Sequence, residues 1–306
     1  MKAEGDGVSE FDHAVGAGAG ERCVSARVDG EVAVIMIDHP PVNGLAHGVR
    51  SGLVAAFDAA RRDAKVRAIV LAGAGRGFSA GGDIKEFGTP AATAWPALSM
   101  DVHPVIEACE KPVVAAMHGL AVGGGLETAM VCHYRVAAGD TKVGLPELKR
   151  GVIPLSGTQR LPRALGVARA IDLILGGELV PARTLGDGAL FDRLIEGDPQ
   201  TVLSAAIAFA RERIGASPPP RIRDRPVPDA DPAAVLAVAR TRLAADDRIG
   251  REALDAIAAA VESPDFDAGM AIARAIYDRL VASDEVRRQR DRFFADRKKG
   301  TGGIKA

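Results

Sequence analysis

The chain has 306 residues, of which 47% are hydrophobic and 26% are charged, and its formal net charge is −1. This length allows one sizeable core with a smaller additional region, and the near-neutral charge argues against a nucleic-acid-binding surface. No apolar run is as long as the roughly 20 residues of a membrane-spanning helix. Because the three cysteines are few and widely separated, we expect no disulfide framework and a cytoplasmic location.

The first part of the chain alternates strand and helix patterns. Residues 1–21 are rich in Gly and Ala without apolar periodicity, which predicts a disordered leader, and the start lacks the basic-then-apolar order of a signal peptide. Residues 31–38 are typical of a strand, the apolar spacing over 47–63 predicts a helix, and 67–73 indicates a second, buried strand. Repeated strand-turn-helix units imply parallel pairing with right-handed crossovers, which is an α/β fold.

Two glycine-rich turns follow buried strands. A loop over 75–86 leaves the strand at 67–73 and leads toward a helix, and the strand at 112–117 is followed by a turn at 123–125 that opens another helix. Backbone N–H groups at such a turn are free to stabilise an oxygen that becomes negative. Because parallel strands end at the same edge of a sheet, one donor from each turn can hold a single oxygen.

Two carboxylates accompany these turns. Glu127 falls in the first turn of the helix that follows the second glycine cluster, and Glu147 ends a Gly-Leu-Pro-Glu stretch twenty residues later. Carboxylates beside backbone donors suggest general acid/base chemistry. Alternatively, Glu127 is an acidic first-turn residue that only complements the helix dipole.

The C-terminal third follows a proline-rich segment. Residues 216–232 contain six of the eighteen prolines and are expected to form a linker, which would separate a core over 22–215 from a helical region over 233–306. The arginine-rich run at 287–290 is expected to be a solvated helix face, although it could meet phosphates. The four helices that apolar stripes predict here span 232–245, 248–262, 266–282 and 284–297.

Five motifs in a set order are more specific than any single glycine string. They are Pro41-Val42-Asn43-Gly44-Leu45, Ser79-Ala80-Gly81-Gly82-Asp83-Ile84-Lys85, Gly123-Gly124-Gly125-Leu126-Glu127, Gly144-Leu145-Pro146-Glu147 and Gly157-Thr158-Gln159-Arg160-Leu161-Pro162-Arg163. Together they resemble the crotonase superfamily, the enoyl-CoA hydratases and isomerases, over roughly residues 22–295. The segment Cys132-His133-Tyr134-Arg135-Val136-Ala137 and the long C-terminal region are most similar to the hydratase/isomerase half of the multifunctional enzymes of fatty-acid oxidation.

The resemblance implies a spiral of ββα units, followed by C-terminal helices that pack an oligomer and cover a CoA tunnel. It also implies the reversible syn addition of water to trans-2-enoyl-CoA, which gives 3-hydroxyacyl-CoA, with Δ3-Δ2-enoyl-CoA isomerisation as a possible second activity. The N–H groups of Gly82 and Gly124 would hold the thioester oxygen, Glu127 would accept a proton from the attacking water, and Glu147 would supply the proton at C2. The residues expected to contact CoA are Val42, Leu45, Ala80, Gly81, Asp83 and Ile84.

The expected partners follow from the same resemblance. An acyl-CoA thioester is the expected substrate, with coenzyme A as part of it, and neither a separate cofactor nor a metal is expected. A homo-oligomer, either a trimer or a dimer of trimers, is expected, without nucleic acid or membrane. Residues 153–156 depart from the Pro-Gly-Ala-Gly-like turn of many relatives, which puts the preferred acyl length in doubt.

Three alternatives are open at this stage. The first is a crotonase-fold isomerase alone, and the second is a crotonase-fold protein without catalysis. The third is a serine hydrolase with Ser79 in a G-x-S-x-G elbow, although no histidine follows His133, where such an enzyme needs its base. No nucleotide or metal site is expected, because residues 16–20 lack the G-x-G-x-x-G spacing of an NAD site, and His118 and His133 have no carboxylate or Cys at metal-ligand spacing.

Overall fold

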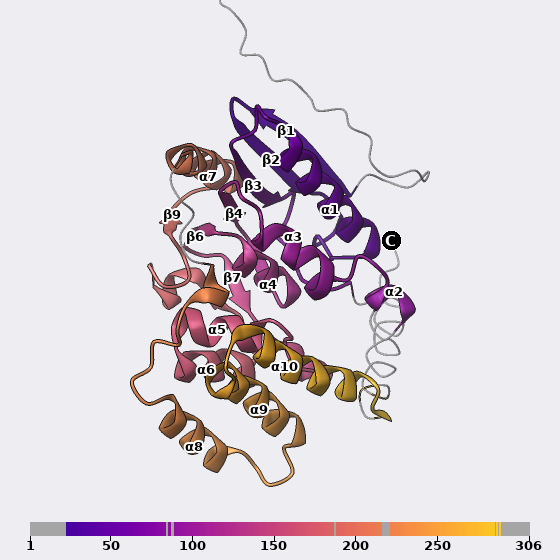
Figure 1. Cartoon of the computed structure of the whole chain (residues 1–306), viewed down its shortest axis with the longest axis vertical. Helices are drawn as coiled ribbons and strands as arrows, with labels where there is room; N and C mark the ends of the chain where they lie inside the picture. The colour runs from indigo at the N-terminus through magenta and orange to yellow at the C-terminus, as the bar shows by residue number, and fades with distance from the viewer. Residues whose placement is uncertain are drawn as a thin grey trace, which may run out of the picture. The chain divides into compact units, whose positions relative to one another are not determined.

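A computed structural model describes residues 23–83, 85–86, 89–186, 188–215, 221–284, 286 and 288. The chain divides into two compact units (Figure 1). The first unit comprises Met1–Gly144 with Leu179–Arg225, and the second comprises Leu145–Glu178 with Pro226–Ala306. The leader predicted at 1–21 and the first five residues of the predicted linker lie outside the described residues. The domain boundaries drawn from the sequence therefore stay predictions.

The first unit is built on a six-stranded sheet with the strand order β1-β2-β3-β4-β6-β9. β1 and β2 form an antiparallel hairpin, and every later pair in this sheet is parallel. This arrangement confirms the predicted α/β class with parallel strands. The strands are β1 Val24–Asp29, β2 Val32–Ile37, β3 Ala68–Gly73, β4 Val113–Met117, β6 Tyr134–Ala138 and β9 Arg193–Ile195.

Several strands of this unit were not predicted from the sequence. β1 was not predicted, because its residues are mostly half-buried and lack the long apolar run of β2. A second sheet contains β5 Leu120–Val122, β7 Lys142–Gly144 and β8 Val180–Pro181 in the order β5-β7-β8. β5 lies where the sequence suggested a direct turn into a helix, and strands of two or three residues leave too little periodicity to be recognised.

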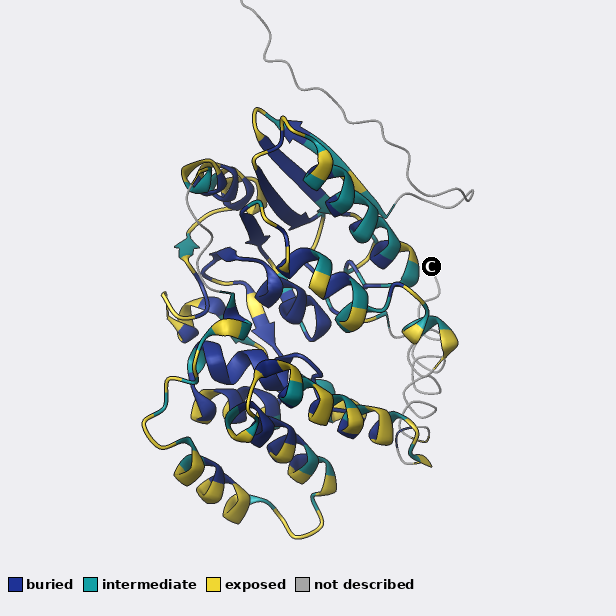
Figure 2. Ribbon diagram, viewed as in Figure 1, coloured by how far each residue is buried: buried dark blue, intermediate teal, exposed yellow. Residues whose placement is uncertain are grey.

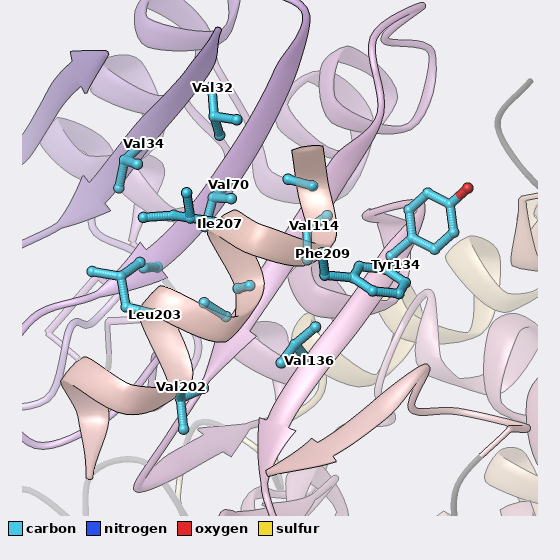
Figure 3. Close-up of a cluster of buried hydrophobic side chains, with 14 of the residues drawn as sticks. Val32, Val34, Val70, Val114, Tyr134, Val136, Val202, Leu203, Ile207 and Phe209 are labelled. Atoms are coloured by element: carbon cyan, nitrogen blue, oxygen red, sulfur yellow. The ribbon is translucent and has the colours of Figure 1, made fainter. Parts of the chain in front are cut away.

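Helix α7 (Pro199–Arg213) covers one face of the large sheet (Figure 3). Its buried side chains pack against a row of valines that come from β2, β3, β4 and β6. Phe209 meets Tyr134 edge to face, with ring centroids 5.3 Å apart, a preferred geometry for aromatic pairs. The helix is capped by Asp198, the residue before it, whose carboxylate accepts the Thr201 N–H at 2.8 Å.

Among the other helices of the first unit, α1 packs against β1 and β2. The predicted helix over 47–63 is confirmed as α1, whereas the helix expected after residue 86 is only the short α2, which has a Pro in its first turn. Figure 2 shows β3, β4 and α4 as buried elements. The remaining bounds are α1 His47–Arg62, α2 Pro90–Thr93, η1 Leu98–Val102, α3 His103–Glu107, α4 Gly124–Val131, η3 Ala182–Leu185 and η4 Ile222–Asp224.

The second unit is helical. The helices predicted at 232–245, 248–262 and 266–282 are confirmed as α8 (Pro232–Arg242), α9 (Arg248–Glu262) and α10 (Phe266–Val281). Each begins after an aspartate whose side chain accepts a backbone N–H of the first turn. The helix predicted at 284–297 lies mostly outside the described residues, as do most residues of the run at 287–290.

Helix α9 lies at the centre of the second unit, against α8, α10, α5 (Gly157–Leu165) and α6 (Val167–Gly176). The short η2 (Glu147–Arg150) precedes α5 in the chain. Arg160 and Arg163 are buried over the Phe266 ring, at 4.7 and 5.2 Å from its centroid. Throughout the part of the chain that the structure describes, every helix is too short or too polar to cross a bilayer.

Candidate active site

Two glycine-rich segments of the first unit lie against each other. Ser79 pairs with Ala121 in a parallel bridge, with the Ser79 N–H donating to Leu120 O at 3.1 Å and the Val122 N–H donating to Ser79 O at 2.9 Å. A Cβ on Gly125 would stand 2.3 Å from Ser79 O, closer than any side chain permits. The two turns predicted from the sequence are therefore brought into direct backbone contact.

The Gly81–Gly82 peptide is oriented by a hydrogen bond. The Leu45 N–H donates to Gly81 O at 2.8 Å. In a trans peptide the C=O and N–H point in opposite directions, so the Gly82 N–H faces away from Leu45. Gly82 N lies only 3.3 Å from the position that a Cβ on Gly124 would occupy. The N–H groups of the first glycine turn are thereby placed next to the start of α4.

Position 81 requires a glycine because of its backbone conformation. Its φ is +88°, a region that residues with a Cβ rarely adopt. A Cβ there would also stand 2.6 Å from Val122 O and 2.9 Å from Gly124 N. The close approach of the two segments thus depends on the absence of a side chain at Gly81.

Gly124 is the first residue of α4, so its N–H has no partner within the helix. Across the described residues, neither the Gly82 N–H nor the Gly124 N–H donates to a protein acceptor. The helix dipole adds partial positive charge at the same end. Two adjacent, unused N–H donors at a helix start form a site for an oxygen that carries negative charge.

The two predicted carboxylates belong to different units. Glu127 lies in the first turn of α4, as predicted, and is only 5% exposed. The turn before it is tied to β7 by a hydrogen bond from the Gly123 N–H to Gly144 O at 2.9 Å. Glu147 begins η2 in the second unit, three residues after β7 ends, and is partly buried.

The residues predicted to contact CoA are brought together by backbone hydrogen bonds. The Ala80 N–H donates to Val42 O at 2.9 Å, next to the Leu45–Gly81 bond. Asp83 lies close to the Cα of Gly44, since a Cβ on Gly44 would stand 3.7 Å from Asp83 Cα. The sixth residue of this set, Ile84, lies outside the described residues.

The Asn43 side chain holds the loop that carries these residues by hydrogen bonds, a role that was not predicted from the sequence. Its backbone adopts a φ of 54°, and its Nδ2 donates to both Ala74 O and Gly77 O at 2.8 Å. Its Oδ1 accepts the His39 N–H at 2.9 Å. An Asn followed by Gly is a typical signal for such a turn, but only the fold shows which carbonyls it reaches.

Ser79 does not resemble a nucleophile. Its side chain is fully buried, its hydroxyl donates to Asn43 O at 2.7 Å, and its Oγ accepts the Gly81 N–H at 3.1 Å. An elbow serine is instead exposed at the top of its turn beside a histidine. The contacts of Ser79 therefore give it a structural role and do not support the hydrolase alternative.

The two histidines that flank the glycine turn are bonded to backbone groups. His118 Nε2 lies 3.1 Å from Gly75 O. His133 Nδ1 accepts the Val113 N–H at 3.1 Å, while its Nε2 lies 3.3 Å from Glu107 O, and burial lowers the pKa of this imidazole. Within the described ranges, no group of three or more His, Cys, Asp or Glu residues could hold a metal ion.

Arg135, to which the sequence assigned no role of its own, anchors the other end of α4. Its side chain is 1% exposed, and its Nη1 donates to Cys132 O at 2.7 Å, just past the last residue of the helix. Asp192 provides the counter-charge at 3.4 Å. Burial raises the pKa of the neighbouring Cys132 thiol to about 12, so that this thiol is unreactive at neutral pH.

Comparison with known proteins gives consistent results. A family model described as enoyl-CoA hydratase/isomerase matches residues 27–220. A probable enoyl-CoA hydratase of Bacillus subtilis (strain 168) is 42% identical over 200 residues, which cover 64% of this chain and 77% of that relative. The peroxisomal bifunctional enzyme of Homo sapiens is 35% identical over 280 residues, which cover 89% of this chain but only 38% of that enzyme. The chain thus matches well under half of the bifunctional relative.

A solved structure supports the same assignment. The crystal structure of carnitinyl-CoA hydratase from Mycobacterium avium aligns with a TM-score of 0.66 and 29% identity, and the alignment covers 90% of this chain and 97% of the other. The predicted crotonase-like fold is therefore confirmed.

Proposed function

The chain belongs to the enoyl-CoA hydratase/isomerase family, and from this premise we propose that it adds water reversibly, with syn geometry, across the 2,3 double bond of a trans-2-enoyl-CoA. The product is a 3-hydroxyacyl-CoA. Because the family includes both activities, Δ3-Δ2-enoyl-CoA isomerisation is a second candidate reaction at the same site.

The observation that carries the proposal is the pair of adjacent N–H donors at Gly82 and Gly124. Conjugation with the thioester makes C3 electrophilic, and attack on C3 drives negative charge onto the thioester oxygen. Two preorganised donors stabilise that charge more in the transition state than in the substrate. The turn is built from backbone groups, so the donors need no reorganisation when the charge develops.

The carboxylates supply the proton transfers. Glu127 is buried in the same first turn as the Gly124 donor, and it accepts a proton from water as the water attacks C3. Glu147 supplies the proton at C2, a role that rests on its Gly-Leu-Pro-Glu motif and on family membership. In isomerisation, the same Glu147 moves a proton between C2 and C4. General acid/base catalysis of this kind needs neither a metal nor a nucleotide cofactor.

Coenzyme A enters as part of the substrate. Backbone hydrogen bonds join the Pro41–Leu45 motif to the Ser79–Lys85 motif, which supports the proposal that Val42, Leu45, Ala80, Gly81, Asp83 and Ile84 contact it. The acyl-CoA thioester is the proposed partner, without nucleic acid or membrane.

We further propose that the chain assembles with copies of itself, as a trimer or a dimer of trimers. Val238 on α8 is 50% exposed and Ile272 on α10 is 46% exposed, and packing against another copy would remove these apolar side chains from water. Sedimentation velocity checks this proposal, and a monomer at micromolar concentration would contradict it. A cytoplasmic location is also proposed, because all three cysteines are free thiols.

Glu127→Gln and Glu147→Gln test the mechanism, because glutamine keeps the side-chain volume and loses the proton transfer. Each change should lower the turnover number for hydration of a trans-2-enoyl-CoA by at least about a hundredfold, while substrate affinity should change far less. Glu196→Gln is the matched control, since the Glu196 side chain is 89% exposed. Hydration is followed as loss of the conjugated absorbance, in buffer that contains a chelator and no NAD.

The two variants should also differ in whether they keep isomerase activity. With a 3-enoyl-CoA, Glu147→Gln should abolish isomerisation, whereas Glu127→Gln should retain part of it, because isomerisation consumes no water. Folded Glu127→Gln and Glu147→Gln proteins that both hydrate at near-parental rates would show that the carboxylates are structural. That result would favour a crotonase-fold protein without this catalysis.

A further inference from the structure

Arg50 joins several backbone segments around the glycine turns. It lies in α1, is 3% exposed, and its Nη1 donates to Leu45 O at 2.9 Å and to Glu86 Oε2 at 2.8 Å. Its Nε donates to Pro96 O at 2.8 Å, and its Nη2 donates to Ala91 O at 2.6 Å. The donors of a guanidinium are fixed in one plane. This buried side chain therefore holds its acceptors, on residues 45, 86, 91 and 96, in fixed positions relative to one another.

Glu86 connects Arg50 to the start of α1. Its Oε1 accepts the His47 N–H at 2.8 Å, at the first residue of α1, where the N-cap residue Ala46 has no side chain that can cap the helix. One carboxylate therefore caps α1 and pairs with Arg50. The Glu86 N–H also donates to Asp83 O at 3.0 Å, which ties the pair to the residue that follows Gly82.

Two of the acceptors of Arg50, the carbonyls of Leu45 and Pro96, belong to segments that contact the proposed oxyanion donors. The Leu45 carbonyl is held by Arg50, and the Leu45 N–H sets the plane of the Gly81–Gly82 peptide. On the other side, Leu98 lies two residues beyond Pro96, and its Cδ2 stands 2.9 Å from the position of a Cβ on Gly124. The position of Arg50 thus affects the Gly82 donor through Leu45 and the surroundings of Gly124 through Pro96 and Leu98.

We propose that Arg50 and Glu86 are positioning residues that hold the Gly82 N–H at its catalytic angle to the Gly124 N–H. This inference rests on the proposed hydratase function and assigns a role to a charged pair that the proton transfers do not use. Because the donors act mainly on the transition state, a small rotation of the Gly81–Gly82 peptide should lower kcat more than it raises KM.

Glu86→Gln and Arg50→Lys test the proposal. In Glu86→Gln an acceptor becomes an N–H2 group, so either Arg50 or the His47 N–H loses its partner. In Arg50→Lys the charge remains, but one ammonium cannot reach all four acceptors of the planar guanidinium. We expect kcat for hydration to fall by about ten- to a hundredfold in both variants, the range that a donor displaced by a fraction of an ångström produces, with KM within about threefold of the parent.

A second readout reports the donors directly. The absorbance of bound para-dimethylaminocinnamoyl-CoA shifts to longer wavelength when hydrogen bonds polarise its thioester carbonyl, so the shift measures the strength of the donor pair. The shift should shrink in Glu86→Gln and in Arg50→Lys. Glu252→Gln is the matched control, because Glu252 of α9 also pairs with an arginine, Arg279, and its side chain is 16% exposed, against 18% for Glu86.

The outcomes separate this inference from the function on which it rests. A parent protein that neither hydrates enoyl-CoA nor shifts the probe would overturn the function itself. An active parent whose folded Glu86→Gln variant keeps both kcat and the shift would overturn the positioning role alone. Equal losses of kcat in Glu252→Gln and Glu86→Gln would also overturn it, since they would reflect general destabilisation. If Arg50→Lys does not fold, Glu86→Gln decides between these outcomes.

Discussion

Replacing Gly81 by alanine should damage both stability and activity, whereas the same change at Gly82 should do little. At Gly81 the backbone φ is +88°, and a Cβ would stand 2.6 Å from Val122 O and 2.9 Å from Gly124 N. Both neighbours are backbone atoms, so neither can move without shifting a strand or the start of a helix. At Gly82 a Cβ would meet nothing within 4 Å, and the N–H donor is retained.

The free-energy cost of Gly81→Ala has two contributions. An alanine in the left-handed region costs roughly 1–2 kcal/mol, and forcing a methyl group into a packed site costs about 1–3 kcal/mol. Gly81→Ala should therefore destabilise the protein by roughly 2–5 kcal/mol, which lowers Tm by about 4–20 °C for a unit of this size. Relief of the clash must also move the Gly124 donor, and a misplacement of about 1 Å costs on the order of a hundredfold in turnover.

Thermal unfolding and hydration of a trans-2-enoyl-CoA, measured on both variants beside the parent, test this reasoning. Gly82→Ala should stay within about 3 °C in Tm, since changes that clash with nothing are usually small, and should keep most of its kcat. A Gly81→Ala protein with parental Tm and kcat would refute the geometry of the turn. So would a Gly82→Ala protein that loses as much activity as Gly81→Ala, because it would mean that more than the backbone of Gly82 is needed.

Two further predictions concern buried polar groups. Burial lowers the pKa of His133 in the folded protein, so the unfolded chain binds this proton at a higher pH than the folded protein does. The contribution of His133 to the free energy of unfolding is therefore complete above the unfolded pKa of about 6.5 and declines below it. The stability advantage of the parent over His133→Asn, from chemical denaturation, should therefore shrink between about pH 7.5 and 5, and an advantage independent of pH would contradict this. Ser79→Ala removes two backbone contacts and should cost roughly 1–2 kcal/mol in stability while most of kcat remains; a folded variant without activity would restore the hydrolase alternative.

Local patterns in the sequence were enough for most of the regular elements. The apolar runs of β2, β3 and β4 and the helical spacing of α1 and α8–α10 depend on residues a few positions apart, and these elements appear close to where they were predicted. Likewise, the glycine clusters and the first-turn position of Glu127 are local features, because turn and helix starts are set by backbone conformation. β5 was missed because three residues are too few to show a period, and β1 was missed because its half-buried residues lack a long apolar run.

Only the tertiary structure decided which distant groups meet. The bond from Leu45 to Gly81 and the four bonds of Arg50 join residues between 5 and 46 positions apart, and nothing in the local sequence distinguishes Arg50 from other arginines on a helix. Parallel strands bring their carboxyl ends to one edge of a sheet, which explains why two glycine turns far apart in the chain can share a site. The orientation of the Gly82 donor, however, depends on a hydrogen bond across that edge, and such a contact forms only when the whole sheet is assembled.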